Sequence, residues 1–134
     1  MALFQALHTA TSGAQTARVW LDAIADNVAN VNTTRSPDEE PFRARMVVAE
    51  ATTGDDGRGT GVRVRAIEER GGDAPVSYDP SHPDADEFGL VRRANVDMGT
   101  EMSNLLLANR VFQMNLTVMD RAIDSYRAAL RIGT

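Results

Sequence analysis

The chain has 134 residues, a formal net charge of -5 at pH 7 and no cysteine. This length suits one domain with a single core, but only 5% of the residues are aromatic, so the core must be thin. The acidic balance argues against nucleic-acid binding, which needs a basic face. The lack of cysteine excludes disulfides and cysteine-based zinc sites. No segment has the length and apolarity of a transmembrane helix, and the N-terminal region lacks the pattern of a cleaved signal peptide.

Residues 1–33 carry the periodicity of a long amphipathic helix. Apolar residues recur at alternating spacings of three and four, which is a heptad pattern. They are Leu7, Ala10, Ala14, Ala17, Leu21, Ile24, Val28 and Val31. The small alanines let a partner helix approach closely. Gly13 costs about 1 kcal/mol in a helix relative to alanine, so we expect another backbone to pack against it.

Residues 100–134 repeat the pattern. The row consists of Met102, Leu105, Asn109, Phe112, Leu116, Met119, Ile123, Tyr126 and Leu130. Asn109, the polar member, either fixes the register of a helix pair or marks a wetted edge. Because the two rows have similar lengths and lie at opposite ends of the chain, we predict an antiparallel, coiled-coil-like pair that forms one discontinuous helical domain.

The insert at residues 34–99 is predicted to be β-rich. Residues 42–50 and 61–69 have strand composition, the polar residues 52–61 would join them as a hairpin tip, and residues 76–78 could add a short strand. The predicted fold is therefore mainly α with a small β insert. Further apolar residues lie outside the two rows and need a cover, which is either a third layer from the insert or other subunits; these are Val19, Trp20, Leu106, Met114 and Val118.

The sequence offers little support for catalysis. The glycine-rich tip lacks the ending of a phosphate-binding loop. Candidate metal or acid/base groups gather in residues 78–89, namely Asp79, His82, Asp84, Asp86 and Glu87. An EF-hand starting at Asp84 would place Asn95 where a bidentate glutamate belongs, and short polar residues between prolines are ordinary turn chemistry. We therefore predict no enzymatic activity, no cofactor and no metal site.

Three segments resemble the bacterial flagellar rod and hook proteins. The string NVANVNT at residues 27–33 is similar to their N-terminal signature, residues 77–97 resemble a segment typical of a proximal-rod protein, and residues 101–133 resemble the C-terminal helix of that group. The resemblance implies a structural subunit that polymerises into the proximal rod and transmits motor torque. It further implies export by the flagellar type III apparatus without a cleaved signal peptide, a periplasmic position, and contacts with other rod proteins and the adaptor at the rod base. Gly99 and Thr100 depart from the family pattern, which suggests a later start of the second helix.

The resemblance also indicates which residues could contact neighbouring subunits. Asn27, Asn30 and Asn32 fall outside the two buried positions of the heptad, so we expect their amides to bridge adjacent subunits; for Asn32, a left-handed helix cap is the equal alternative. The full candidate set is Gly13, Asn27, Asn30, Asn32, Asn109, Arg110, Phe112 and Asn115. Competing functions are a different rod component, a stand-alone coiled-coil adaptor and a metal-dependent hydrolase, the last disfavoured by the failed metal motif.

Overall fold

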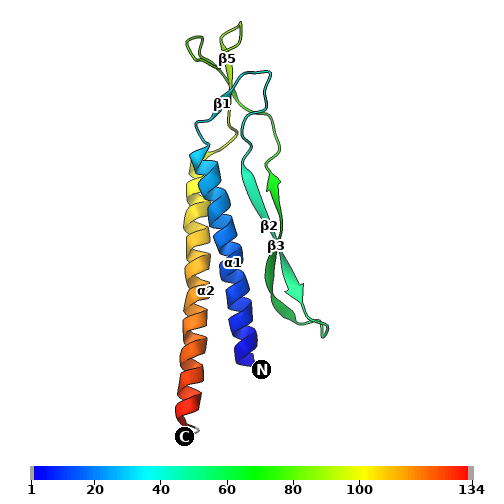
Figure 1. Ribbon diagram of the computed structural model, residues 1–134, viewed down its shortest axis with the longest axis vertical. Coiled ribbons are helices and arrows are strands. Elements are labelled where there is room, and N and C mark those ends of the chain that lie inside the picture. The colour runs from blue at the N-terminus through cyan, green and yellow to red at the C-terminus, as the bar shows by residue number, and fades with distance from the viewer. Residues whose placement is uncertain (1, 133–134) are drawn as a thin grey trace.

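The computed structural model describes residues 2–132, and two long helices dominate it. Helix α1 (Ala2–Ala29) and helix α2 (Met98–Ile132) lie side by side and run in opposite directions (Figure 1). The pairing register is visible in the contacts of Phe4 with Tyr126 and of Thr11 with Met119. The predicted antiparallel pair is therefore confirmed. Residue 1 and residues 133–134, which the predicted helices included, lie outside the described residues.

The face of α2 that meets α1 differs from the predicted row. Its buried residues are Glu101, Ala108 and Ala122, each one position before the predicted Met102, Asn109 and Ile123, which are exposed. Leu105, Phe112 and Met119 of the predicted row are partly buried. The predicted row is thus right at Leu105, Phe112 and Met119 and wrong at the positions between them, and its last members, from Ile123 onward, are exposed. The closely packed interface takes small side chains and leaves several large ones outside.

Helix α2 begins at Met98, so the expectation of a later start is wrong. Asp97 explains the early start. Its Oδ1 accepts a hydrogen bond from the backbone N–H of Thr100 at 2.6 Å, while its carbonyl accepts the N–H of Glu101 at 3.0 Å. This is the geometry of an N-cap, which satisfies a helix donor that would otherwise lack a partner. The cap compensates for the weak helix former Gly99 in the first turn.

We expect Asp97→Ala to lower the melting temperature at neutral pH but much less in acid. Hydrogen bonds from the Thr100 side chain and then from its backbone lower the pKa of Asp97. A lowered folded-state pKa contributes stability above the unfolded value of about 4 and loses it as the pH falls through the folded value. Thermal unfolding between pH 2 and 7 checks this, with Asp120→Ala as an exposed control on the same helix. A wild-type advantage that stayed constant with pH would contradict the charged cap.

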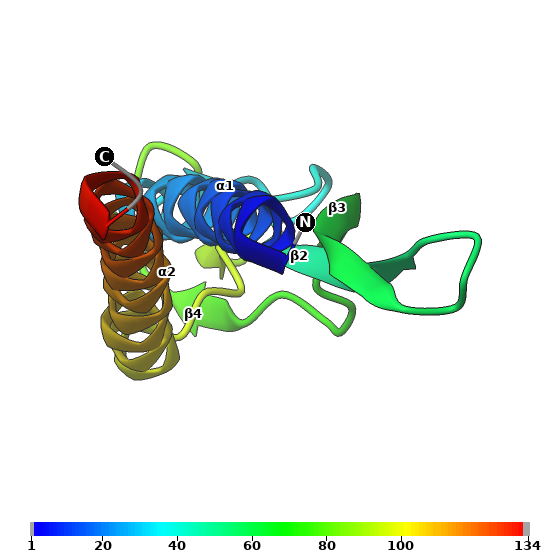
Figure 2. The same cartoon turned by 90° about the horizontal axis from the view of Figure 1, so that it is seen from below.

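Strands β2 (Arg45–Thr53) and β3 (Gly59–Glu69) form an antiparallel hairpin beside α1. Figure 2 shows α1 lying between α2 and this hairpin, and within residues 2–132 the hairpin packs on α1 and not on α2. Val19 and Trp20 on α1 are partly buried, whereas Leu106 and Met114 on α2 are exposed. The insert therefore supplies a third layer for α1 only, and α2 keeps a bare apolar surface.

A second sheet lies beyond the end of the helix pair at which α1 ends and α2 begins (Figure 1). It has the strand order β1-β5-β4, with β1 (Thr34–Arg35), β5 (Leu90–Arg93) and β4 (Val76–Tyr78) all paired antiparallel. The sequence predicted β4 with these bounds, but it missed β1 and β5 because such short strands show no clear alternation. The division of the chain into a discontinuous helical domain and an insert stays a prediction.

Candidate assembly surface

Asn27 is the most constrained residue of the signature. Its side chain is 1% exposed, so the prediction that it lies outside the buried positions is wrong. Its Oδ1 accepts the backbone N–H of Arg45 at 2.7 Å, and its Nδ2 donates to the Arg45 carbonyl at 2.9 Å and to Oε2 of Glu101 at 3.1 Å. All of these partners belong to the same chain. The amide is therefore occupied within the subunit and not free to bridge to a neighbour.

The heptad pattern does not predict the burial of Asn27 because α1 has two partners, α2 and the hairpin. A heptad describes the contact with one helix, but the hairpin also packs on α1. Ala23 and Asn27 are buried although both lie outside the predicted row. Glu101 completes this arrangement: it is 2% exposed, and its Oε1 lies 3.8 Å from the guanidinium of Arg70. No buried side-chain nitrogen or oxygen in the described part of the chain lacks a hydrogen-bond partner. Sequence reasoning did not find Glu101, Arg45 or Arg70.

Asn30 and Asn32 lie where α1 ends. The Asn30 amide donates to the Asp26 carbonyl at 2.8 Å and its Oδ1 accepts the Thr33 hydroxyl at 3.1 Å, so this residue closes the last turn. Asn32 is exposed. Among residues 2–132, only glycines have a positive φ, so the left-handed cap considered for Asn32 is wrong. A role for either residue between subunits stays a prediction.

Gly13 and Asn115, both in the predicted assembly set, face each other across the helix pair. A Cβ built on Gly13 would lie 2.5 Å from Oδ1 and 2.8 Å from Cγ of Asn115. The Asn115 amide is held in place by donating to the Val111 carbonyl at 2.9 Å. Gly13 therefore makes room for a side chain of α2 in the same subunit, where we expected another backbone.

The other candidates on α2 are accessible to different degrees. Asn109 is exposed and accepts a hydrogen bond from Gln113 at 2.8 Å, so the wetted-edge interpretation holds and the register interpretation does not. Arg110 is exposed and Phe112 is partly buried. Asn109 and Arg110 border a shallow hollow of about 320 Å³ that Leu105, Leu106 and Gln113 complete.

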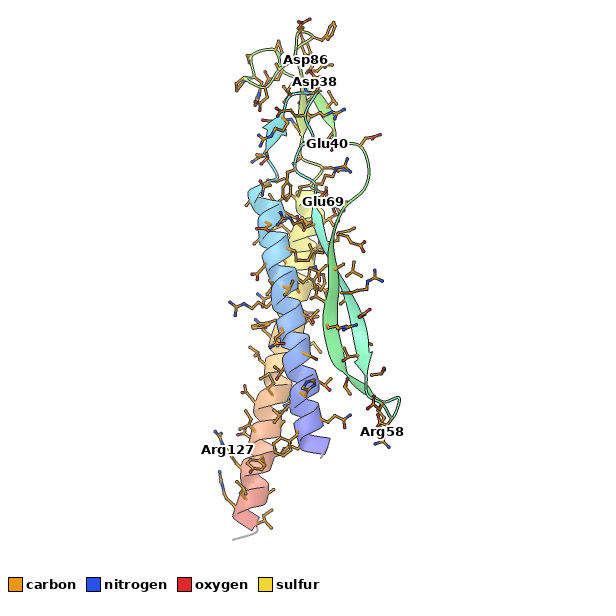
Figure 3. The ribbon with its side chains drawn as sticks, turned by 45° about the vertical axis from the view of Figure 1, so that its right-hand side comes forward. Asp38, Glu40, Arg58, Glu69, Asp86 and Arg127 are labelled. Atoms are coloured by element: carbon orange, nitrogen blue, oxygen red, sulfur yellow. The ribbon has the colours of Figure 1, made fainter. Side chains whose placement is uncertain are left out.

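The outer surface of α2 carries many exposed apolar side chains. Figure 3 draws the side chains along this helix. Leu106 is 74% and Met114 is 62% exposed. The other large apolar residues exposed on this helix are Met98, Met102, Leu107, Leu116, Val118, Ile123, Tyr126, Leu130 and Ile132. An apolar surface of this extent on a small chain indicates an interface with other proteins.

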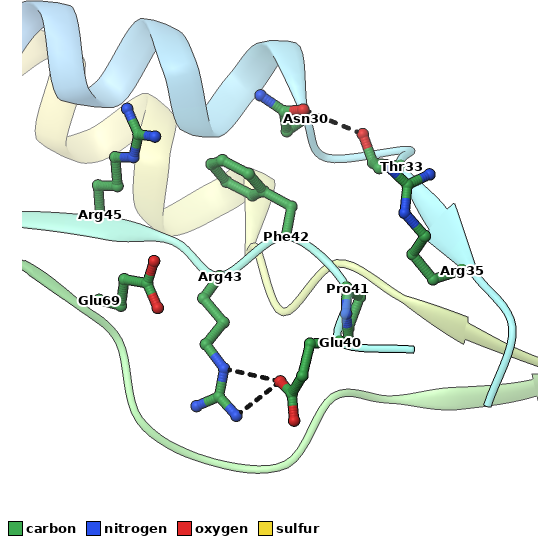
Figure 4. A pocket seen from close by; sticks show the side chains of 9 residues that line it. All are labelled: Asn30, Thr33, Arg35, Glu40, Pro41, Phe42, Arg43, Arg45 and Glu69. Carbon is green, nitrogen blue, oxygen red and sulfur yellow. Dashed lines mark hydrogen bonds and ion pairs between the residues drawn. The ribbon is translucent and has the colours of Figure 1, made fainter. Parts of the chain in front are cut away.

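A polar pocket of about 410 Å³ lies where α1 meets the base of the hairpin (Figure 4). Three arginines border it, and each pairs with an acidic side chain: Arg43 with Glu40 at 2.9 Å, Arg45 with Asp26 at 2.8 Å and Arg35 with Glu39 at 3.7 Å. The hydrogen bond to Glu40 raises the pKa of Arg43. Because these charges are matched by neighbouring carboxylates, the pocket is a poor site for an anion.

The acidic residues at 79–87 hold a turn together. Oδ1 of Asp86 accepts the backbone N–H groups of Phe88 and Leu90 at 2.9 and 2.8 Å, and Oδ2 of Asp84 accepts the Thr34 hydroxyl at 2.6 Å. Gly89, at φ 74°, closes the turn against Pro80. Within residues 2–132 no group of three or more histidine, aspartate or glutamate side chains is placed to hold a metal ion. The carboxylates of Asp79, Asp84 and Asp86 thus have structural partners within the chain.

The two terminal helices match two known protein families. The family described as "Flagella basal body rod protein" matches residues 7–35, and the family described as "Flagellar basal body rod FlgEFG protein C-terminal" matches residues 89–132. These matches span most of the helix pair, including Asn27 and Glu101. The chain is therefore a structural subunit of the bacterial flagellar basal-body rod, and it is not an enzyme.

Relatives that match over most of their length show which family of rod proteins the chain belongs to. The chain is 33% identical to FlgC of Borreliella burgdorferi, over 98% of each chain, and 32% identical to FlgC of Bacillus subtilis, over 99% of each. It is 36% identical to FlgC of Aquifex aeolicus over 87% of this chain and 86% of the relative. The chain belongs to the FlgC family of rod proteins, and the resemblance inferred from its sequence is confirmed. Neither helix in residues 2–132 combines the length and apolarity needed to span a membrane.

Proposed function

We propose that this subunit polymerises into the proximal rod through the bare apolar surface of α2, and that the packed helices transmit the motor torque. The observation that carries the proposal is the exposure of large apolar side chains along this helix. A single subunit in water gains nothing from exposing them. Contact with neighbouring helices would remove them from water at about 25 cal/mol per Å² of apolar area.

The bare side chains occur on two sides of the arc that α1 covers. Leu107, Met114 and Val118 are spaced by seven and four residues, and so are aligned along one side of α2. Met102, Leu116 and Ile123 are spaced by multiples of seven and are aligned along another. One partner helix cannot cover both sides. This favours a subunit with several neighbours over the alternative of a coiled-coil adaptor that forms a discrete dimer.

Contacts between unlike surfaces of successive subunits extend without closing and so build an open helical assembly. We propose other rod proteins as the neighbours and the basal-body adaptor as the contact at the rod base. Asn32, Asn109 and Arg110 remain proposed contact residues because they are exposed. Kinship with FlgC supports these partners, as well as export by the flagellar type III apparatus without a cleaved signal peptide and a periplasmic position.

We expect Met114→Asp combined with Val118→Asp to abolish rod assembly and motility. Both side chains are exposed in the subunit, at 62% and 47%, so the free subunit should keep its helical content. Buried in an interface, the two carboxylates would lack partners and carry a large desolvation penalty. Motility of a complemented deletion strain and recovery of the subunit in purified basal bodies check this, with circular dichroism of the purified subunit as the folding control.

The matched control is Thr117→Asp, which puts one charge on an exposed polar residue of the same helix turn. We expect this variant to swim. Normal basal bodies from the double variant would contradict assembly through this side of α2. Loss of helical content in its free subunit would show instead that the two residues support the fold.

A further inference from the structure

We propose that Asn27 acts as a substitute strand residue that fixes the β2–β3 hairpin to the helix pair, and that Glu101 holds its amide in place. The joint, as we define it, consists of Asn27, Arg45, Arg70 and Glu101. Its contacts bring together α1, the start of β2, the residue that follows β3 and the first turns of α2. The first asparagine of the signature would then position parts of one subunit.

The hydrogen bonds of Asn27 have the pattern of a β-ladder. In an antiparallel pair, a residue accepts an N–H from and donates an N–H to the residue opposite it. Oδ1 and Nδ2 of Asn27 do the same for the N–H and C=O of Arg45, at 2.7 and 2.9 Å. Arg45 is the first residue of β2, on an edge that a two-stranded ribbon leaves unpaired. One side chain of α1 therefore takes the place of a third strand at the base of the hairpin.

Asparagine is the side chain whose chemistry fits this position. It offers one acceptor oxygen and two N–H donors, and the second donor reaches Oε2 of Glu101 at 3.1 Å. Aspartate would keep the acceptor but lose both donors. Glu101 in turn lies 3.8 Å from Arg70, whose backbone N–H donates to the Ala44 carbonyl at 2.6 Å. Both strands of the hairpin are thus tied to the helices at this level.

A second attachment lies near the tip of the hairpin. The backbone N–H of Val62 donates to Oγ of Ser12 at 3.1 Å, and Gly61 leaves room for this hydroxyl because a Cβ there would collide with it. The two attachments are about 22 Å apart along α1, at 1.5 Å per residue. Ser12 is only partly buried, whereas Asn27 and Glu101 are almost fully buried. We therefore infer that the contacts of the joint, more than those of Ser12, fix the position of the hairpin on the helices.

Asn27→Asp tests the proposal through its pH dependence. The variant would place a second carboxylate next to that of Glu101, and two such groups share a proton in acid but repel each other once both are ionised. The charged groups around them are Arg70, which also acts on Asp97, and Arg45 with its partner Asp26. We expect the melting temperature of the variant to fall below that of the wild type by an amount that grows between pH 4 and pH 8, to about 5 °C or more.

Hydrogen exchange locates the effect. At pH 8, amides of residues 46–53 in the variant should exchange at least about tenfold faster than in the wild type, while those of 104–120 in α2 keep their protection. Glu101→Gln in the same variant removes one charge and supplies an N–H donor to the new carboxylate, so the double variant should lose most of the pH dependence and recover part of the stability. The rest stays lost because the Arg45 carbonyl still lacks the donor that Asn27 supplied. Asn32→Asp, an exposed change near the end of α1, is the matched control and should show no such loss.

The stability measurements on these variants can support or overturn the role proposed for Asn27. A variant Asn27→Asp that behaves like Asn32→Asp at every pH, or a double variant that recovers nothing, would overturn the proposal. If the single variant does not fold, the double variant decides: its folding supports a carboxylate pair at this position, and its failure to fold contradicts it. All measurements use the purified subunit, so the result does not depend on how the rod assembles.

Discussion

Replacing Ala108 with leucine is expected to destabilise the free subunit by about 2 kcal/mol or more, because extra methyl groups in a close-packed site force the structure apart. Ala108 has 0% exposure on the face of α2 that packs against α1. Because the site is fully covered, the two long helices would have to separate locally to admit the larger side chain. In a chain of this size the change corresponds to a fall in melting temperature of about 8 °C.

Leu106→Ala is the matched control, because it changes the same two residue types in the opposite direction on the bare side of the helix. Leu106 is 74% exposed, and surface substitutions usually change the free energy of unfolding by less than about 0.5 kcal/mol. Urea denaturation of both purified variants, followed by circular dichroism, gives the comparison. Equal stability losses in the two variants would mean that the interface of α2 has been assigned to the wrong face.

The contrast between these positions shows where sequence reasoning succeeded and where it stopped. The repeating spacing of apolar residues predicted both helices and their pairing, because amphipathic periodicity reflects burial on one face. The same reasoning assigned Met102 and Leu116 to the helix interface, and both are exposed. For an isolated protein that choice is natural. In a subunit of an assembly, large apolar residues also mark surfaces that only neighbours cover, and one chain does not distinguish the two.

The buried polar contacts around Asn27 were harder to predict from the sequence. The three asparagines near residue 30 stood out because asparagine is a mediocre helix former, and that observation drew attention to Asn27, although its predicted outward position is wrong. Its partners were not predictable, since Arg45 contributes backbone atoms, which leave no mark on the side-chain sequence. Glu101 has an ordinary place for an acidic residue, in the first turn of a helix. Only the three-dimensional arrangement shows that it is buried beside an amide.

The close approach of the helices at Gly13 makes a second strong prediction. In an isolated helix, Gly13→Ala would be stabilising by about 1 kcal/mol. In the subunit the new methyl group would collide with Oδ1 and Cγ of Asn115, at 2.5 and 2.8 Å. Asn115 could move away only by giving up its hydrogen bond to the Val111 carbonyl. We therefore expect Gly13→Ala to destabilise the subunit by about 1–2 kcal/mol.

The sign of the effect should reverse once Asn115 is shortened. The three atoms nearest to the methyl group introduced by Gly13→Ala all belong to the Asn115 amide, and an Asn115→Ala background removes them. The helix propensity of alanine should then dominate, and the substitution should stabilise by about 1 kcal/mol. The double-mutant cycle, measured by urea denaturation, isolates the coupling between the two residues. Stabilisation by Gly13→Ala in both backgrounds would show that Asn115 yields freely. Destabilisation in both would mean that the limit on the helix spacing lies in another contact.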